Sequence, residues 1–270
     1  MQQSESVPMA AAEVSAEVPF LEAHFENMSL TERRDYFFEN GFVLVPGVLN
    51  AARLQKIYGD IERAGLGERG TPFDIPEFAA QIANPEMLRT VRAIYGQDLR
   101  FFKGVYWAKK QEPRSEMARQ WLHFDWGTTE HADDFRNTSP SWVNVGMYLD
   151  SLTPDNGPLY IVPGSHRRLD LAPGTRVEAE FSTHVRRVLA RAGDAVLFHC
   201  FTAHAGGHNF SNGPRRALFY SYRPGWATPI GPVPEWPESA AAMFINAAGS
   251  TDVSLLKNLS NGMLRPAVMK

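Results

Sequence analysis

The feature that most constrains the fold is a change of pattern after Gly96, where short runs typical of β-strands replace longer helical stretches. Gly, Pro, Asn and Asp separate these runs, as expected for strands joined by turns. Seven runs can be recognised, at Leu99–Lys109, Gln120–Asp125, Trp142–Asp150, Leu159–Val162, Arg186–Arg191, Ala195–Cys200 and Arg215–Arg223. Many short strands with tight turns predict a sandwich or barrel, and a jelly roll is a natural candidate. Residues 192–194, Ala-Gly-Asp, predict a hairpin turn between two of the strands.

The segment before Gly96 carries helix signals. Ser29 and Glu32 form a capping box, in which each side chain accepts a hydrogen bond from an N–H at the start of a helix. That helix should end at Asn40-Gly41, because glycine tolerates the left-handed conformation that terminates helices. Asn50 and Asn84 predict the starts of two further helices, each followed by apolar residues at helical spacing. An apolar run at 42–46 predicts a short strand after the first helix.

Together these patterns predict a mainly β protein with flanking helices. We expect one domain over residues 21–270, preceded by a loose tail at 1–20. Within the domain, a helical N-terminal layer at 28–96 packs on a jelly-roll core at 97–223. The C-terminal extension at 224–270 is Pro-rich and then Ala-rich, and we expect it to wrap the barrel.

Composition excludes several functional classes. The chain is 44% hydrophobic and 21% charged, with a net charge of -3, so nothing favours a nucleic-acid or membrane partner. Its single cysteine, Cys200, cannot form an intrachain disulfide, which fits a reducing compartment. No N-terminal segment resembles a signal peptide, and no apolar run approaches the ~18 residues of a membrane span. We therefore expect a cytoplasmic protein; its oligomeric state cannot be read from the sequence.

The sharpest local signal is His123-Phe124-Asp125. Residues two apart in a strand point to the same face, so the imidazole and the carboxylate would project together. Two histidines and one carboxylate form the facial triad that holds Fe(II) and leaves open positions for other ligands. The triplet alone is also compatible with a surface histidine near an aspartate.

A third metal ligand must come from a distant segment, and three histidines compete for that role: His199, His204 and His208. They lie where a buried strand runs into a Gly-rich bend. Small neighbours on both sides of His204 leave room for the close approach of a metal and its other ligands. His199 fits better as a packed strand residue, and His208 as a loop residue.

Arg215 opens the apolar strand at Ala217–Tyr222. An arginine that faces inward on such a strand needs a partner, because a buried unpaired charge is costly. The carboxylate of a cosubstrate would supply a bidentate partner. The alternative is a surface salt bridge, a role that suits the neighbouring Arg216.

Several motifs occur in an order that resembles the phytanoyl-CoA dioxygenase family of Fe(II)/2-oxoglutarate-dependent oxygenases. The resemblance covers roughly residues 34–223. It comprises the opening Phe37–Gly47, the His123/Asp125 triplet, Thr153–Leu159 with Pro163–His166, and the pattern GD…FH…HAG..N…R from Gly193 to Arg215.

The resemblance implies a double-stranded β-helix core, and Fe(II), 2-oxoglutarate and O2 as cofactor and cosubstrates. It makes His204 the distal iron ligand beside His123 and Asp125, and it assigns Arg215 to the far carboxylate of 2-oxoglutarate. Gln120 matches a glutamine that contacts 2-oxoglutarate in relatives. The carboxylate at Asp125 favours hydroxylation over halogenation, because related halogenases carry a small residue there.

Two positions depart from the family pattern. Some relatives carry Ser two residues after the distal histidine, where this chain has Gly206. Some carry Thr at the position of Leu159. The hydrogen bonds to 2-oxoglutarate therefore cannot be carried over from the family.

These features predict a dioxygenase that hydroxylates an unactivated C–H of a small-molecule metabolite while decarboxylating 2-oxoglutarate to succinate and CO2. Tyr106, Trp126 and Arg223 are candidates to line the substrate pocket, and the polar stretch 127–141 is either a lid or a surface loop. Three alternatives stay open. The same iron site could perform desaturation, epimerisation or ring formation; a cupin-like barrel could hold another metal; or the chain could be a non-catalytic binding module.

Overall fold

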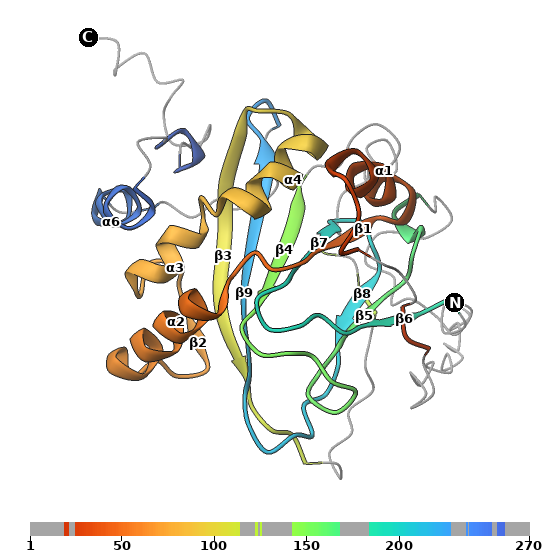
Figure 1. Cartoon of the computed structure of the whole chain (residues 1–270), viewed down its shortest axis with the longest axis horizontal. Helices are drawn as coiled ribbons and strands as arrows, with labels where there is room; N and C mark the ends of the chain where they lie inside the picture. The colour runs from red at the N-terminus through yellow and green to blue at the C-terminus, as the bar shows by residue number, and fades with distance from the viewer. Residues whose placement is uncertain are drawn as a thin grey trace, which may run out of the picture.

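The structure is a computed structural model, and it describes residues 19–21, 25–113, 122–123, 125, 142–167, 184–227, 236, 238–249 and 253–256. Two β-sheets form its centre, with helices at the left and the top of the strands in Figure 1. Its elements follow the predicted order, with helices concentrated before Gly96 and strands after it.

The predicted helix starts are confirmed. In α1 (Leu30–Asn40), Ser29 and Glu32 form the reciprocal capping box, and Gly41 ends the helix at φ 79°. Asn50 caps α2 (Ala51–Ala64) through Arg53 N–H, and Asn84 caps α4 (Pro85–Tyr95) through Met87 N–H. A further short helix, α3 (Pro76–Gln81), was not predicted; it begins without a side-chain cap, so packing rather than capping stabilises it.

The larger sheet has six strands in the order β1-β7-β4-β9-β3-β2. Their bounds are β1 Phe42–Val45, β2 Arg69–Gly70, β3 Leu99–Lys109, β4 Val143–Tyr148, β7 Ala195–His199 and β9 Arg215–Pro224. Tyr220 and Tyr222 of β9 donate hydrogen bonds from their hydroxyls to Phe78 O of α3 and to Ile82 O, so one face of this sheet packs on the helices. Alternate residues of β9 and β3 point to the opposite, inner face.

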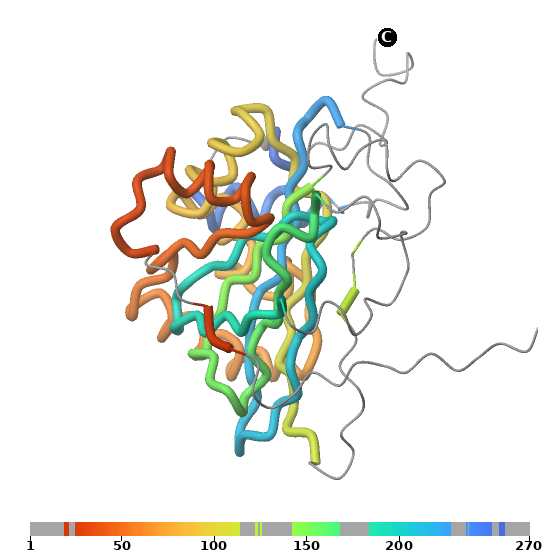
Figure 2. Tube along the Cα trace, turned by 90° about the vertical axis from the view of Figure 1, so that its right-hand side faces the viewer, coloured from red at the N-terminus to blue at the C-terminus, as the bar shows by residue number. Residues whose placement is uncertain are grey.

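The smaller sheet has three strands in the order β6-β5-β8: β5 is Leu159–Ile161, β6 Arg186–Val188 and β8 His204–Gly206. It lies beside the inner face of the larger sheet, away from the helices, which Figure 2 shows on one side of the strands. This is the double-stranded β-helix, or jelly roll, that the strand pattern predicts.

The expected hairpin at residues 192–194 is wrong. Gly193 does form a tight turn at φ 94°, but the strands on either side, β6 and β7, belong to different sheets. β7 pairs instead with β1 and β4. The turn therefore carries the chain from one sheet to the other, and the predicted strand at 42–46 becomes an edge of the larger sheet.

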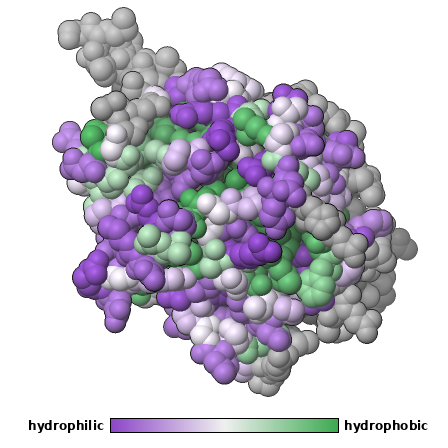
Figure 3. All heavy atoms as spheres, viewed as in Figure 1, coloured by the Kyte–Doolittle hydropathy of each residue, from purple (hydrophilic) through white to green (hydrophobic). Residues whose placement is uncertain are grey.

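The C-terminal extension contributes one helix, α6 (Glu238–Ala248), which packs on α3 at the outer side of the fold and buries Phe244. Two 3-10 turns, η2 (Ser165–Arg167) and η4 (Val253–Leu256), complete the described elements. On the helical face, hydrophilic and hydrophobic residues are intermixed, with hydrophilic ones gathered over α2 (Figure 3). No helix in the described segments is long and apolar enough to cross a membrane.

Gly41 links the end of α1 to the bend between β7 and β8. Its carbonyl accepts hydrogen bonds from His199 N–H at 2.8 Å and from the Thr202 hydroxyl at 2.8 Å. A Cβ at this position would overlap His166 Nδ1 and Thr202 Oγ1. The bend that leads to His204 is therefore built directly against the helix end.

We predict that Gly41→Ala lowers the free energy of unfolding by about 2–4 kcal/mol in urea denaturation. About 1–2 kcal/mol comes from forcing a left-handed alanine, and the rest from overpacking. Gly47→Ala is the matched control, since Gly47 also has a positive φ of 64° but a Cβ added there would meet no atom within 4 Å. Equal losses for the two variants would contradict the proposed role of the contact.

Candidate metal centre and cosubstrate pocket

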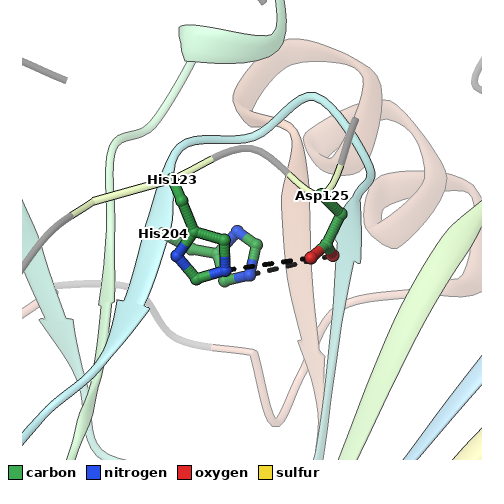
Figure 4. A group of neighbouring side chains, drawn as sticks. All are labelled: His123, Asp125 and His204. Carbon is green, nitrogen blue, oxygen red and sulfur yellow. Dashed lines mark ion pairs between the residues drawn. The ribbon is translucent and has the colours of Figure 1, made fainter. Parts of the chain in front are cut away.

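A backbone bridge brings two of the predicted ligands together. His123 N–H donates to His204 O at 2.9 Å, and His204 N–H donates to His123 O at 3.0 Å. Residues paired in this way across antiparallel segments place their side chains on the same face of the sheet. The two imidazoles accordingly lie side by side, with ring centroids 4.4 Å apart. Figure 4 shows both rings turned towards Asp125.

Asp125 completes the group. Its N–H donates to Cys200 O at 3.2 Å, which ties the segment to the bend after β7. Its carboxylate oxygens lie 3.8 Å from His123 Nε2 and 3.8 Å from His204 Nε2 (Figure 4). One ligand atom from each residue falls within 4.8 Å of the others, and the described segments contain no second such group. Two imidazole nitrogens and one carboxylate oxygen suit Fe(II), so the residues fit the metal.

His204 is held in the form that can bind a metal. Its Nδ1 lies 2.8 Å from Thr202 O, so Nδ1 carries the proton and Nε2 presents a lone pair towards Asp125. Burial lowers the pKa of His204, with the Asp125 charge opposing that shift, and this favours the neutral imidazole. The Thr202 hydroxyl is bonded in turn to Gly41 O. The orientation of His204 thus rests on the end of α1.

The other two candidate histidines have structural partners. His199 is buried in β7, and its Nδ1 accepts a hydrogen bond from Phe201 N–H at 2.9 Å. Burial lowers the pKa of His199 well below its usual value, so this ring is neutral. His208 lies in the loop after β8, with Nδ1 2.8 Å from Glu112 Oε2. Neither histidine belongs to the group around Asp125.

Two polar side chains, Asn144 and Ser221, hold the Asp125 carboxylate in place. Asn144 of β4 donates a hydrogen bond from Nδ2 to Asp125 Oδ2. Ser221 of β9 donates from its hydroxyl to Asn144 Oδ1 at 2.7 Å, which sets the orientation of the amide. Asn144 and Ser221 are 6% and 4% exposed, so these hydrogen bonds are shielded from water. The chain from β9 to Asp125 holds one carboxylate oxygen in place.

The three side chains open into a cavity of about 270 Å³ on the inner face of the larger sheet. Its lining includes Arg69, Lys103, Trp107, Asn144, Tyr148, Leu159, Phe198, Gly206, Arg215, Phe219 and Ser221. A more open hollow of about 520 Å³ elsewhere is lined by Tyr106 and Arg216 and does not include the triad. The smaller cavity is therefore the candidate site.

Arg215 lies in this cavity and is 2% exposed. Its guanidinium is surrounded by aromatic rings, 5.6 Å from the centroid of Trp107 and 5.8 Å from those of Tyr148 and Phe219. It makes no ion pair with a described residue, and its Nε has no hydrogen-bond partner. Burial lowers the pKa of Arg215, yet a guanidinium stays protonated in proteins. A buried cation in this state calls for an anionic ligand.

Other predicted site residues lie elsewhere. Gln120, Trp126 and the stretch 127–141 are outside the described residues.

Tyr106 is 1% exposed and stacks on Phe78, because its side chain leaves β3 on the face that packs on the helices. Arg223 is buried at the opposite end of β9 from Arg215, where its Nη1 donates to Ala227 O. Neither Tyr106 nor Arg223 is among the described residues that line the cavity with the triad.

Sequence reasoning overlooked Asn144, Ser221 and Tyr148. A signal for the first was available, since Asn144 is a polar residue inside the otherwise apolar run Val143–Tyr148. Buried polar side chains are nearly always hydrogen-bonded, so an amide in such a strand indicates a specific partner. Ser221 and Tyr148 carry no comparable signal, because Ser and Tyr are common in strands of this kind.

Among curated proteins, this chain is similar to a dioxygenase and to a hydroxylase. The probable alpha-ketoglutarate-dependent hypophosphite dioxygenase of Stutzerimonas stutzeri is 21% identical over 240 residues, covering 75% of this chain and 81% of the relative. The L-proline trans-4-hydroxylase of Streptomyces griseoviridis is 30% identical over 156 residues, covering 48% of this chain and 58% of the relative.

Solved structures share the fold. Iron-bound HygX from Streptomyces hygroscopicus superposes with a TM-score of 0.60 and 21% identity, covering 72% of this chain and 86% of that one. The same protein has been solved with nickel and 2-oxoglutarate bound. The alpha-ketoglutarate-dependent epimerase SnoN from nogalamycin biosynthesis superposes with a TM-score of 0.59 and 21% identity, covering 72% and 80%.

The model of the phytanoyl-CoA dioxygenase (PhyH) family matches residues 68–217, more than half of the 270 residues. This span contains the triad, Asn144 and Arg215. The chain belongs to the phytanoyl-CoA dioxygenase family and is an Fe(II)/2-oxoglutarate-dependent dioxygenase.

Proposed function

We propose that this enzyme hydroxylates an unactivated C–H of a small-molecule metabolite. One O2 is consumed: one oxygen atom enters the new C–OH, and the other enters succinate as 2-oxoglutarate loses CO2. The observation that carries the proposal is the buried Arg215 guanidinium, which has no ion-pair partner among the described residues and lies in the same cavity as the triad. A binding module or a metal hydrolase would have no need of a buried cation there.

In this proposal His123, Asp125 and His204 hold the iron. Bound iron with 2-oxoglutarate supplies an oxidant able to attack an unactivated C–H. Arg215 binds the far carboxylate of 2-oxoglutarate and so orients the cosubstrate along the inner face of β9. Gln120, by family likeness, is a further contact to 2-oxoglutarate. The surrounding rings of Trp107, Tyr148 and Phe219 exclude water from the Arg215 end of the cavity.

The departures from the family pattern make Arg215 more important here. Gly206 and Leu159 both line the cavity, and neither side chain can donate a hydrogen bond. Tyr148 lies in the same lining, and burial raises the pKa of its phenol, which therefore stays protonated and can donate. We assign Tyr148 as an auxiliary donor to the carboxylate that Arg215 binds.

The cavity favours a small substrate. Its volume of about 270 Å³ is near the low end of the range for ligand pockets, ~300–1,000 Å³, and it must also hold 2-oxoglutarate. The relatives named for hypophosphite and L-proline act on small molecules by name. The presence of Asp125 supports hydroxylation rather than halogenation. Mass spectrometry separates the outcomes: hydroxylation adds one oxygen atom, whereas epimerisation leaves the mass unchanged and desaturation or ring formation removes two hydrogens.

We predict that Arg215→Met weakens 2-oxoglutarate binding about 10- to 100-fold, because charge-assisted hydrogen bonds worth ~1.5–3 kcal/mol are lost. The measurement is an anaerobic titration of the Fe(II) enzyme with 2-oxoglutarate, followed by its visible charge-transfer band. Wild type should also prefer 2-oxoglutarate over 2-oxobutyrate, which lacks the far carboxylate, and Arg215→Met should lose this preference. A charge-transfer band absent from iron-loaded wild type would refute the cosubstrate assignment.

Arg216→Met is the matched control for that experiment. Arg216 is the next residue on β9 but faces the other side of the sheet, where its guanidinium donates two hydrogen bonds to the Asp150 carboxylate, at 2.8 and 2.9 Å. Its replacement should reduce stability and leave the dissociation constant of 2-oxoglutarate unchanged. Equal weakening in both variants would show that the effect comes from a general disturbance of β9.

We predict that Asn144→Ala weakens Fe(II) binding about 10- to 100-fold, the usual cost of removing a residue that orients a metal ligand. The Asp125 carboxylate would lose the donor that fixes one oxygen, while all three ligands remain. Ser221→Ala should give a smaller loss, because it frees the Asn144 amide to turn without removing it. Competition with a metal-sensitive chelator measures both, and an unchanged iron affinity in Asn144→Ala would rule out the positioning role.

A further inference from the structure

A β-bulge in β3 places a lysine beside the metal centre. The register of β3 against β9 shifts between Phe101, opposite Tyr222, and Lys103, opposite Ser221. The extra residue is Phe102, which packs on Trp142 with ring centroids 5.9 Å apart. Lys103 follows and lines the cavity. The bulge thus lets Phe102 pack in the core while Lys103 points into the cavity. Bulges near active sites often redirect a side chain in this way.

Lys103 lies at the iron end of the cavity. Its partner Ser221 is the start of the hydrogen-bond chain through Asn144 to Asp125. Any substrate placed for attack at the metal would therefore lie within reach of this side chain.

A second cation, Arg69 of β2, lies further along the same wall. Its Cζ is 3.8 Å from the centroid of the Trp107 ring, and Arg69 pairs with Trp107 in the sheet. This stacking holds the guanidinium over the cavity without neutralising it. Neither Arg69 nor Lys103 forms an ion pair with a residue that the structure describes.

The charges of the lining do not balance. Asp125 is the one acidic residue among the cavity's described lining, against Arg69, Lys103 and Arg215. Once iron and 2-oxoglutarate are bound, the two offset each other, and Asp125 offsets Arg215. The two remaining cations, Lys103 and Arg69, are uncompensated. A cavity with such a field attracts and retains negatively charged ligands.

We propose that the substrate carries an anionic group, a carboxylate or a comparable oxyanion, and that Lys103 binds this group beside the metal. Arg69 adds attraction from the other end of the wall. The inference rests on the proposed function, and it deepens that function by naming the substrate class. Oxyanions of carbon and of phosphorus share the recognising chemistry, so the choice between them is left to the experiment.

The test uses the Fe(II)- and 2-oxoglutarate-loaded enzyme with pairs of probes that match in shape and differ in charge. N-acetyl-L-proline and lactate are each compared with their neutral methyl ester or amide, and methylphosphonate with its dimethyl ester. Binding is read from the change in the charge-transfer band under anaerobic conditions, and turnover from succinate release in air. We expect the anionic member of at least one pair to bind more tightly and to stimulate more succinate release. No preference for any anionic member overturns the proposal.

The variant Lys103→Met tests whether Lys103 is the group responsible for the preference for anionic probes. We expect the KM or dissociation constant of the favoured anion to rise about 10- to 100-fold, the loss of a charged hydrogen bond, with that of its neutral partner unchanged. Lys110→Met is the control, because Lys110 is an exposed lysine just beyond β3 that pairs with Glu68 at 3.0 Å. An unchanged anion preference in Lys103→Met would reassign the preference to another group and reject the role of Lys103.

Failure of this inference can be told apart from failure of the proposed function. If the charge-transfer band forms and 2-oxoglutarate is decarboxylated, but neutral probes are favoured, only the anion assignment falls. If iron binds and no band or succinate appears with any probe, the proposed function itself falls. Lys103 is exposed, so its replacement should leave folding and iron binding intact.

Discussion

The metal centre depends on one backbone bridge, the pair of hydrogen bonds between His123 and His204. Each residue comes from a short extended segment, and the bridge fixes both the spacing and the facing of their rings. Asp125 lies outside any strand, and its own N–H bond to Cys200 O holds it where its carboxylate faces both rings. The donor set is therefore a consequence of backbone hydrogen bonding, and the side chains need little additional support beyond the bonds to Thr202 and Asn144.

Much of this arrangement can be predicted from the sequence, because local signals and topology agree. Capping residues predict the starts of α1, α2 and α4, and glycine at position 41 predicts the end of α1. Alternation predicts that His123 and Asp125 face together, and small neighbours single out His204 from three histidines. These predictions succeed because each depends on contacts within a few residues.

Predictions that depend on register or distant packing fare worse. Tyr106 and Trp107 are adjacent aromatics, and only the pairing of β3 decides that Trp107 lines the cavity while Tyr106 packs on Phe78. Arg223 differs from Arg215 by its position along β9, which local sequence does not reveal. The turn at Gly193 is recognisable as a turn, but whether it joins strands of one sheet is a property of the whole fold. Helix α3 has no side-chain cap and gains its stability from neighbours such as α6.

Arg215 and Arg216 illustrate how one strand separates two kinds of charge. Arg216 faces the helical side and is neutralised by Asp150 within the fold. Arg215 faces inward, is buried among aromatic rings and has no described partner. An internal carboxylate would have stabilised the empty protein and blocked the cosubstrate. Burying the Arg215 charge without a partner costs free energy, and an anionic ligand offsets this cost when it binds. Part of the ligand's binding free energy therefore comes from a cost that the unliganded protein already carries.

The bulge at Phe102 has a consequence for how such an enzyme can diversify. The metal ligands come from the His123–Asp125 segment and β8, whereas Lys103 comes from a strand that supplies none of them. Because Phe102 fills the space against Trp142, the exposed side chain at position 103 is not needed to pack the core. Substitutions at that position can change which molecules are accepted while the core and the iron site stay as they are. The bulge thus separates the position proposed to select the substrate from the residues that hold the iron.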